Sequence, residues 1–453
     1  MSYNNLSGNG RETPMYDAST ADTQSEDSAA PSHSAKAVPT IEGRSTHCRF
    51  CDNDLTHSMV DLGLSPFCED FICEDELQNP EIFRPLETMV CERCWLVQVR
   101  DVYSNSEIFG EDYGYFSSYS SSWLRHARRY VAMATKRFSL DQNSFVVEVA
   151  SNDGYLLRNF VERGIPCLGI DPARNVAAAA ETVGVDTRVE FFTRDMAIQM
   201  RENEQQADLI IGNNVLAHTP YINDFIGAVS CLLKPAGCAT FEFPHLLQLI
   251  RHCQFDTIYH EHYSYFSLFT VCRMFESVGM HVVDVEKLET AGGSLRVFVE
   301  HAASDNAPSA AVAAILEEES EAQLRNITTY DDFGDRAASL KNELLSLLIA
   351  LKKDGKKVIG YGAPGKGNTL LNYCGIKTDL LPATCDRSHH KHGRFCPGSR
   401  IPIFPPELID TEKPDYVLIL PWNLEREITE QLAHIRSWGG KFILPVPSPR
   451  IVE

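Results

Sequence analysis

Phe145-Val-Val-Glu-Val-Ala-Ser-Asn-Asp-Gly154 is the stretch of sequence that decides the fold. Its first five residues form an apolar run typical of a buried strand, and its last five form a polar turn that contains a glycine. We expect a helix to follow from Tyr155. A strand that runs through a tight turn into a helix is the first unit of an alternating α/β sheet, and such sheets bind ligands at the carboxyl ends of their strands. The turn Ala150–Gly154 is therefore a candidate ligand site.

The chain repeats this pattern as far as about residue 300. Apolar runs typical of strands alternate with segments typical of helices, and the last two runs predict an antiparallel pair. We therefore expect an α/β fold with a doubly wound sheet over this part of the chain. The predicted strands are Cys167–Ile170, Asp208–Gly212, Ala239–Phe243 (after a turn at Lys234–Gly237), His281–Val285 and Leu295–Val299.

Asp171, directly after the second predicted strand, indicates what the first turn binds. An acid at this place can accept hydrogen bonds from two ribose hydroxyls, so the pattern favours a nucleoside cofactor. The alternative is that Asp171 caps a helix that begins near Ala173. The turn has one glycine, not the G-x-G-x-x-G of dinucleotide folds, which disfavours NAD.

The segment Tyr259-His-Glu-His-Tyr-Ser-Tyr-Phe266 holds two imidazoles, a carboxylate and three phenols in eight residues. Imidazole is the side chain best suited to act as a base near neutral pH, and a phenol can donate to a developing oxyanion. Such a set can take a proton from a carbon next to a ketone and stabilise the enolate. The alternative is an aromatic-rich loop in which Ser264 or Ser267 caps the amphipathic helix predicted at Leu268–Val278.

Two C-x-x-C pairs, Cys48/Cys51 and Cys91/Cys94, predict a metal site in the N-terminal part of the chain. Four thiolates on two such turns can converge tetrahedrally on zinc, and a site with four cysteine ligands has no open position for catalysis. The alternatives are two unrelated pairs of free thiols or a redox pair. Cys68 and Cys73 have a less suitable spacing.

A second α/β unit begins after the helices predicted at Ala310–Leu324 and Phe333–Lys352. Its first strand leads into the glycine-rich loop Gly362–Thr369, where backbone amides and Lys366 could hold a phosphate. The loop lacks the full Walker pattern, and the alternative is a tight turn without a ligand. The aromatic segment Tyr113–Ser120 could likewise be a lid over a site or a packed linker.

Composition disfavours several classes of protein. The chain has 62 Asp and Glu against 41 Lys and Arg, a formal net charge of -21, which argues against nucleic acid or anionic membranes as partners. No apolar run approaches a membrane span, and the N-terminus lacks the apolar core of a signal peptide. The 14 cysteines then suggest reduced thiols. We expect a cytoplasmic protein, monomeric or homodimeric, with a disordered tail over residues 1–45.

Several of these motifs together resemble one family. They are Glu148-Val-Ala-Ser-Asn-Asp-Gly-Tyr-Leu-Leu157, Gly169-Ile-Asp-Pro172, Asn213-Asn-Val-Leu-Ala-His218, Tyr259 to Ser267, Gly292-Gly-Ser-Leu-Arg-Val-Phe298, Gly360-Tyr-Gly-Ala363 and Leu420-Pro-Trp-Asn423. The chain resembles the sugar C-methyltransferases, which use S-adenosylmethionine and act on nucleotide-linked keto-deoxysugars. The segment Ser388-His-His-Lys-His-Gly393 departs from the Asn-Pro-x-Lys-Gln-Gly pattern expected of this family, so the identity of the sugar stays open.

The resemblance implies three domains: a zinc-binding domain over 46–105, a class I methyltransferase domain over 106–305, and over 306–453 a Rossmann-like α/β domain that binds the nucleotide. It assigns the role of base to His262, of donor to Tyr259, and of sugar contact to Glu261, with His218 and Tyr113 completing the site. The cofactor residues it implies are Glu148, Ala150, Asn152, Gly154, Tyr155, Leu156, Asp171, Pro172, Asn213 and Asn214, and the acceptor residues are Gly362, Lys366 and Asn368.

Three hypotheses about function follow. The first is C-methylation of a nucleotide-linked 4-keto-deoxysugar through an enolate. The second is methylation of oxygen or nitrogen of another small molecule by the same fold. The third is a zinc-containing scaffold protein without catalysis, which the set Tyr259, Glu261, His262 and His218 argues against.

Overall fold

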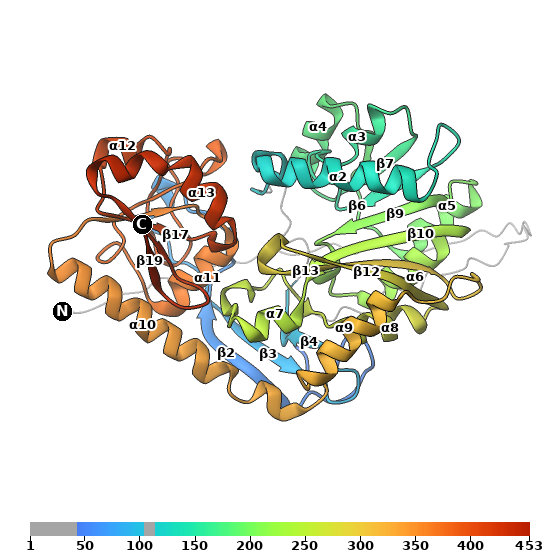
Figure 1. Ribbon diagram of the computed structural model, residues 1–453, viewed down its shortest axis with the longest axis horizontal. Helices are drawn as coiled ribbons and strands as arrows, with labels where there is room; N and C mark the ends of the chain where they lie inside the picture. The colour runs from blue at the N-terminus through green and yellow to red at the C-terminus, as the bar shows by residue number, and fades with distance from the viewer. Residues whose placement is uncertain (1–42, 104–113) are drawn as a thin grey trace, which may run out of the picture. The chain divides into compact units, whose positions relative to one another are not determined.

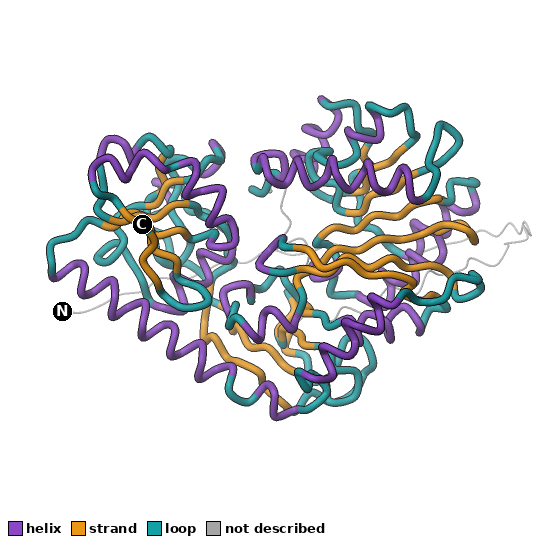
Figure 2. Tube along the Cα trace, in the orientation of Figure 1, coloured by secondary structure: helices purple, strands orange, loops and turns teal. Residues whose placement is uncertain are grey.

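The computed structural model describes residues 43–103 and 114–453, and residues Ile41–Glu453 belong to one compact unit. Strands gather into a small N-terminal sheet, a large central sheet and a C-terminal sheet (Figures 1 and 2). We use the name zinc module for residues 43–103, central module for residues 114–301 and C-terminal module for residues 310–453. A two-stranded ribbon, β1 (Gly43–Arg44) with β5 (Asp101–Val102), joins the two ends of the zinc module.

The central module is built on a seven-stranded sheet with the order β12-β13-β10-β9-β6-β7-β8. Five strands run parallel, and β13 lies antiparallel to both its neighbours, as the sequence predicted. The doubly wound α/β fold is therefore confirmed. The strands are β6 (Val146–Val149), β7 (Cys167–Ile170), β8 (Thr187–Arg188), β9 (Ala207–Asn213), β10 (Leu233–Pro244), β12 (Met280–Leu288) and β13 (Ser294–His301).

Helices cover both faces of this sheet, and the strands divide their side chains between them with a period of two. In β9, Leu209 and Ile211 join the core under α2, whereas Ile210 joins the core under α5, α6 and α8. A strand buried on both faces must be apolar throughout, which explains its continuous apolar run. The helices are α2 (Ser121–Arg137), α3 (Arg158–Val161), α4 (Arg174–Thr182), α5 (Arg194–Glu202), α6 (Ile222–Leu232), α7 (Leu246–Arg251) and α8 (Leu268–Glu276).

The zinc module contributes three strands to a four-stranded sheet whose fourth strand comes from the central module. The order is β11-β4-β3-β2, formed by β2 (His57–Ser65), β3 (Arg84–Val90), β4 (Val97–Val99) and β11 (Ser264–Tyr265). In this sheet Ser264 pairs with Gln98 and Tyr265 with Val97. The segment Tyr259–Phe266 is therefore joined through its backbone to the zinc module.

The C-terminal module has a six-stranded sheet with the order β16-β15-β14-β17-β18-β19, parallel except for its last strand. This is the Rossmann-like α/β arrangement that the sequence predicted. The strands are β14 (Val358–Tyr361), β15 (Thr384–Cys385), β16 (Ile403–Phe404), β17 (Tyr416–Ile419), β18 (Lys441–Leu444) and β19 (Arg450–Val452); the helices are α9 (Ala310–Glu321), α10 (Phe333–Lys353), α11 (Gly365–Cys374), α12 (Leu408–Glu412) and α13 (Glu425–Gln431).

Two local predictions differ from the structure. The turn expected at Lys234–Gly237 lies inside β10, where the register against β9 shifts between Leu233 and Cys238. The helix expected from Tyr155 begins at Arg158, because the residues before it form a turn that buries Tyr155, Leu156 and Leu157 in the core.

Candidate active site and zinc site

The turn after β6 has an unusual backbone. Ala150, Asn152 and Gly154 have φ values of 57°, 49° and 73°, in the left-handed region. Gly154 is required both by this conformation and by packing, because a Cβ there would lie 3.1 Å from the side chains of Val183 and Val185. The turn therefore brings its backbone close to the neighbouring elements at the carboxyl end of β6.

Asp171 is held against this turn. Its Oδ2 accepts a hydrogen bond from the Asn152 backbone N–H at 2.9 Å, and its Oδ1 accepts one from Ala173 at 3.0 Å. Burial raises the pKa of Asp171 to about 6, which these two hydrogen bonds oppose. Helix α4 begins at Arg174 with Ala173 as its N-cap, so the alternative that Asp171 caps this helix is wrong.

Buried polar atoms surround the same place. Asp153 Oδ1 and Asn213 Oδ1 have no hydrogen-bond partner among the described residues, and Asn213 Nδ2 donates to the Tyr155 hydroxyl at 3.4 Å. Glu148, fully buried in β6, has a pKa raised well above its usual range by burial. Buried polar atoms are nearly always satisfied, so this set fits a ligand rich in hydroxyl and amine donors.

The other residues predicted to bind this ligand act through the backbone or the core. Asn214 has a left-handed φ of 56°, and its backbone N–H donates to the Glu242 carbonyl at 2.8 Å. The Leu156 side chain is part of the core, and Pro172 lies half-buried beside Asp171. These residues shape the backbone around the turn.

The aromatic segment before α2 lies over the turn. Ser117 N–H donates to Asn152 Oδ1 at 2.8 Å, Ser118 N–H donates to Asp153 Oδ2 at 3.0 Å, and Asn152 Nδ2 donates to the Tyr115 carbonyl at 3.0 Å. The segment is thus packed over the turn, as both interpretations, a lid and a packed linker, predicted. Tyr113 lies outside the described residues.

His262 is the centre of a second cluster of polar side chains. Its Nδ1 lies 3.0 Å from the Thr257 carbonyl oxygen, which can only accept, so Nδ1 carries the proton. Its Nε2 then accepts from the Tyr259 hydroxyl at 2.7 Å. This arrangement leaves Nε2 as the basic atom.

A second imidazole lies against this one. His218 lies in η3 (Leu216–His218), after β9. Its ring packs edge to face against the His262 ring, with the two ring centroids 4.7 Å apart. Burial lowers the pKa of His218 to about 4, and burial together with His218 lowers that of His262 well below its usual range. Both imidazoles are therefore neutral at neutral pH, the form in which His262 can accept a proton.

The Glu261 side chain contacts other residues than His262 does. Cys68 Sγ donates to Glu261 Oε1 at 3.6 Å, and Glu69 beside it pairs with Lys391 at 3.1 Å. Burial, with the nearby Glu69 charge, raises the pKa of Glu261 to about 8. The sequence suggested Cys68 only as a spare metal ligand and did not indicate Glu69 or Lys391, because no motif links positions so far apart.

The glycine-rich loop adjoins this cluster. Asn368 Nδ2 donates to the Cys68 carbonyl at 2.6 Å, and a Cβ on Gly365 would lie 2.8 Å from Cys68 Sγ. Gly362 has a φ of 87°, and a Cβ there would strike Pro421 at 2.5 Å. The loop thus meets the Cys68–Glu69 segment closely at the start of α11.

Lys366 lies on the other side of this loop. Its Nζ donates to Asn423 Oδ1 at 2.9 Å and lies 5.0 Å from the Trp422 ring centroid. Burial lowers the pKa of Lys366, and the carboxylate of Asp256 opposes that shift. The predicted loop Gly362–Thr369 is thus shorter than expected: Gly362 lies before α11, whereas Lys366 and Asn368 lie in the first turn of that helix, with Lys366 directed toward Asn423.

The remaining residues of Tyr259–Phe266 are packed. His260 Nε2 lies 3.1 Å from the Pro85 carbonyl oxygen, and the Tyr263 hydroxyl donates to the Tyr103 carbonyl at 3.0 Å. Ser267 caps α8 by accepting from Thr270 N–H at 3.2 Å. The capping alternative is thus correct for Ser267, and it accounts for none of the contacts of His262.

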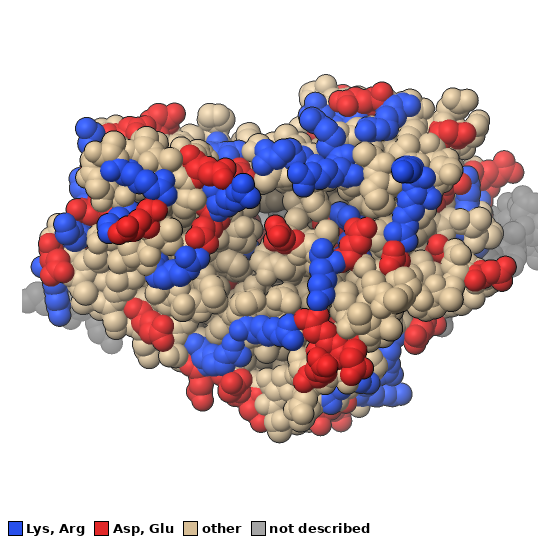
Figure 3. Space-filling model, viewed as in Figure 1, with Lys and Arg blue, Asp and Glu red and all other residues tan. Residues whose placement is uncertain are grey.

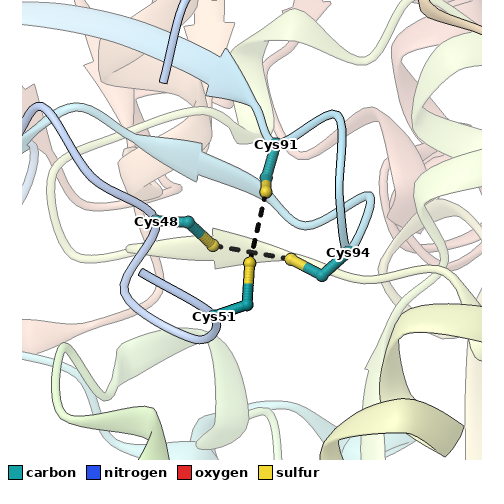
Figure 4. Close-up of side chains that lie close together, drawn as sticks. All are labelled: Cys48, Cys51, Cys91 and Cys94. Carbon is teal, nitrogen blue, oxygen red and sulfur yellow. Dashed lines mark hydrogen bonds between the residues drawn. The ribbon is translucent and has the colours of Figure 1, made fainter. Parts of the chain in front are cut away.

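The four predicted cysteine ligands converge (Figure 4). Their sulfur atoms lie within 4.8 Å of one another, with Cys48 to Cys94 and Cys51 to Cys91 both at 3.5 Å. Four thiolates around zinc, with bonds of about 2.3 Å, are about 3.8 Å apart, so the cluster fits this metal. Cys68 and Cys73 are not part of it.

The described residues include no helix long and apolar enough to cross a membrane. On the face drawn in Figure 3, Lys and Arg side chains lie interspersed with Asp and Glu.

Comparison with known domain families divides the chain in three. A zinc binding domain matches residues 48–109, a methyltransferase domain residues 123–285, and a C-methyltransferase C-terminal domain residues 289–447. Among curated proteins, the C-methyltransferase NovU of Streptomyces niveus is 38% identical over 406 residues, which covers 90% of this chain and 96% of that protein.

Solved structures resemble the central part of the chain at low identity. The magnesium protoporphyrin IX methyltransferase of Synechocystis PCC 6803 with bound S-adenosylmethionine is 12% identical and covers 39% of this chain and 78% of its own, with a TM-score of 0.30. A methyltransferase from Clostridium acetobutylicum ATCC 824 that depends on S-adenosylmethionine is 10% identical. The match covers 39% of this chain and 92% of that protein, with a TM-score of 0.32. At these scores the likeness carries no argument about this chain.

Proposed function

The chain belongs to the family of C-methyltransferases that depend on S-adenosylmethionine, and from this premise we propose that it methylates a nucleotide-linked 4-keto-deoxysugar through an enolate. The observation that carries the proposal is the tautomer of His262. Nδ1–H donates to the Thr257 carbonyl, and Nε2 faces the Tyr259 hydroxyl. A neutral imidazole with a phenol beside it is the pair needed to remove a proton next to a ketone.

His262 Nε2 takes the proton from the carbon next to the keto group. The Tyr259 hydroxyl, which is hydrogen-bonded to His262 Nε2 in this structure, turns to the keto oxygen as negative charge develops there. Glu261 is protonated at neutral pH, so it donates a hydrogen bond to the sugar. His218 keeps the His262 ring neutral and in place.

S-adenosylmethionine supplies an electrophilic methyl group when it is bound. The Asp171 carboxylate would accept hydrogen bonds from its ribose hydroxyls, and the unsatisfied oxygens of Asp153 and Asn213 would accept from its other donors. The segment Tyr115–Ser118 fixes the Asn152 side chain of the turn through two hydrogen bonds. Zinc, held by Cys48, Cys51, Cys91 and Cys94, has a structural role because four thiolates complete its coordination.

The C-terminal module would bind the nucleotide end of the acceptor. The loop Gly362–Thr369 starts α11, whose backbone amides and dipole favour an anion. Asn368 Oδ1 is buried without a partner among the described residues and could accept a hydrogen bond from the acceptor. Lys366, in the first turn of α11, supplies a positive charge that is near enough to His262 to help lower its pKa.

The proposal is tested by incubating the enzyme with a panel of nucleotide-linked keto-sugars in deuterated water. A true acceptor exchanges one α-proton and, with S-adenosylmethionine present, gains a methyl group at the same carbon. An acceptor methylated at oxygen or nitrogen needs no such exchange. Methyl transfer without exchange at any carbon of the acceptor would contradict the proposal.

A further inference from the structure

The proposed function leaves one contact between modules unexplained. Trp422, in η8 (Trp422–Leu424) of the C-terminal module, donates from its indole Nε1 to Asp256 Oδ2 at 2.6 Å. Both side chains are buried, Asp256 completely. A buried carboxylate is costly without partners, so such a contact needs a reason.

Asp256 lies in the short helix η4 (Phe255–Thr257), whose last residue carries the carbonyl that fixes the tautomer of His262. Gln254 holds the start of this helix by donating from Nε2 to the Gly292 carbonyl at 2.8 Å. The backbone of η4 sets the direction of the Thr257 carbonyl. Asp256 is thus one residue from the group on which the basicity of Nε2 depends.

The Trp422 ring is itself fixed. A Cβ on Gly292 would lie 2.5 Å from Trp422 Cη2, so the glycine leaves room for the indole alone. The Lys366 ammonium lies 5.0 Å from the ring centroid on another side. The C-terminal module therefore presents the indole N–H to Asp256 in one orientation.

We propose that Asp256 and Trp422 are positioning residues for His262, and that the C-terminal module sets the tautomer of the base through the bond between them. This inference rests on the proposed function, in which His262 is the base. The chain of contacts is Trp422 Nε1–H to Asp256, along η4 to the Thr257 carbonyl, and from there to Nδ1–H of His262. Loss of the bond frees η4, and Nδ1 no longer keeps its proton.

Trp422→Phe removes the N–H, together with the indole atoms that lie against Gly292, so its control must lose the same atoms elsewhere in the module. Trp438→Phe is the matched control. Its indole Nε1 donates to the Pro414 carbonyl at 3.1 Å in the same module, away from the site. Asp256→Asn keeps an acceptor for Trp422 and is the conservative rescue, whereas Asp256→Ala removes the bond from the other side.

The first readout is the tautomer itself, measured by long-range ¹H–¹⁵N correlation on protein labelled with ¹⁵N-histidine, with His262 assigned from the signals missing in His262→Asn. We expect the ratio of the Nδ1–H to the Nε2–H form to fall about tenfold in Trp422→Phe and Asp256→Ala. The ratio stays close to wild type in Asp256→Asn and Trp438→Phe. A wild-type ratio in Trp422→Phe, or an equal fall in Trp438→Phe, would overturn the proposal.

The second readout is α-proton exchange of the acceptor. A small displacement of a base costs up to about a hundredfold in rate, so exchange should fall between tenfold and a hundredfold in Trp422→Phe. The affinity for S-adenosylmethionine stays unchanged, because Asp256 and Trp422 contact neither Asp171 nor the turn after β6. If the tautomer ratio falls and exchange does not, the positioning role holds and His262 is not the base. The two proposals can therefore fail separately.

Discussion

The two halves of the proposed active site are built in different ways. The cofactor half lies within the central module. It consists of the segment from Glu148 to Asp171, of Asn213 at the end of β9, and of the segment Tyr115–Ser118 over the turn. The acceptor half is assembled from three modules. His262 and Tyr259 come from the central module, Cys68 and Glu69 from the zinc module, and Lys366 and Lys391 from the C-terminal module.

This difference has a consequence for what each half can do. A half made by one module should bind its ligand largely independently of the other modules, so changes there should alter one affinity. A half assembled from three modules depends on all of them, so distant changes should alter the chemical step. The experiments below test this contrast.

The largest effect is expected from His262→Asn. Without the base, turnover and α-proton exchange should fall by about 10² to 10⁴. Affinity for S-adenosylmethionine, measured by calorimetry, should stay close to wild type because His262 does not contact Asp171 or the turn. His252→Asn, in the loop after α7, is the control. Wild-type turnover in His262→Asn would show that the base lies elsewhere.

Loss of zinc should come next. Cys91→Ala removes one ligand, and the metal content should fall well below one equivalent. The hairpin β3–β4 then loosens, and since β4 pairs with β11, turnover should fall about tenfold to a hundredfold. Cofactor affinity should fall much less.

Cys73→Ala is the matched control for this change, because Cys73 is a half-buried cysteine of the same module outside the cluster. A full equivalent of zinc in Cys91→Ala would contradict the four-cysteine site. Equal losses of turnover and cofactor affinity would contradict the contrast between the halves.

Asp171→Ala should give the opposite pattern. It removes a carboxylate whose hydrogen bonds to ribose would be worth about 1.5 to 3 kcal/mol, so the dissociation constant for S-adenosylmethionine should rise about tenfold to a hundredfold. Exchange of the acceptor without cofactor should continue at the wild-type rate. Asp186→Ala, an exposed acid in the same module, should change neither quantity. Loss of exchange in Asp171→Ala would mean that the halves are not separable.

The contrast also explains how much the sequence could predict. The sheet, the turn and Asp171 follow from residues close together, where an apolar period and a glycine are enough. His262 and Tyr259 could be named from their chemistry and the family resemblance. Cys68 and Glu69 could not, because they reach Glu261 and Lys391 across 193 and 322 residues. Whether Asp171 caps a helix was decided only by the backbone around Ala173.

Stability of the protein without ligands should depend on pH through Glu261. Its pKa is about 8 when folded against a usual value of 4.5, so the folded state binds the proton more tightly. The stabilisation is complete below about pH 4.5 and is lost as pH rises through about 8. Between pH 5 and 8 the melting temperature should fall more in wild type than in Glu261→Gln, by about 1 °C for each kcal/mol of unfolding free energy that wild type loses, because the shift is smaller in a larger protein. Parallel curves would contradict this pKa.

The smallest effect is expected at Phe116, whose ring stacks on His390 with centroids 4.8 Å apart. This contact joins the segment Tyr115–Ser118, which lies over the turn after β6, to the C-terminal module. A ring pair is worth about 0.5 to 1.5 kcal/mol, so Phe116→Leu should weaken the effect of cofactor on acceptor affinity by about two- to tenfold. Phe269→Leu, a half-buried ring elsewhere, is the control. If the cofactor changes acceptor affinity by the same factor in Phe116→Leu as in wild type, the contact with His390 only packs the segment.

The most direct test of the division of work is deuterium uptake by the acceptor without S-adenosylmethionine, compared in wild type, Asp171→Ala and His262→Asn. We predict uptake at one carbon, at nearly equal rates in wild type and Asp171→Ala, and at least a hundredfold slower in His262→Asn. Equal uptake in all three proteins, or loss of uptake in Asp171→Ala alone, would contradict the account.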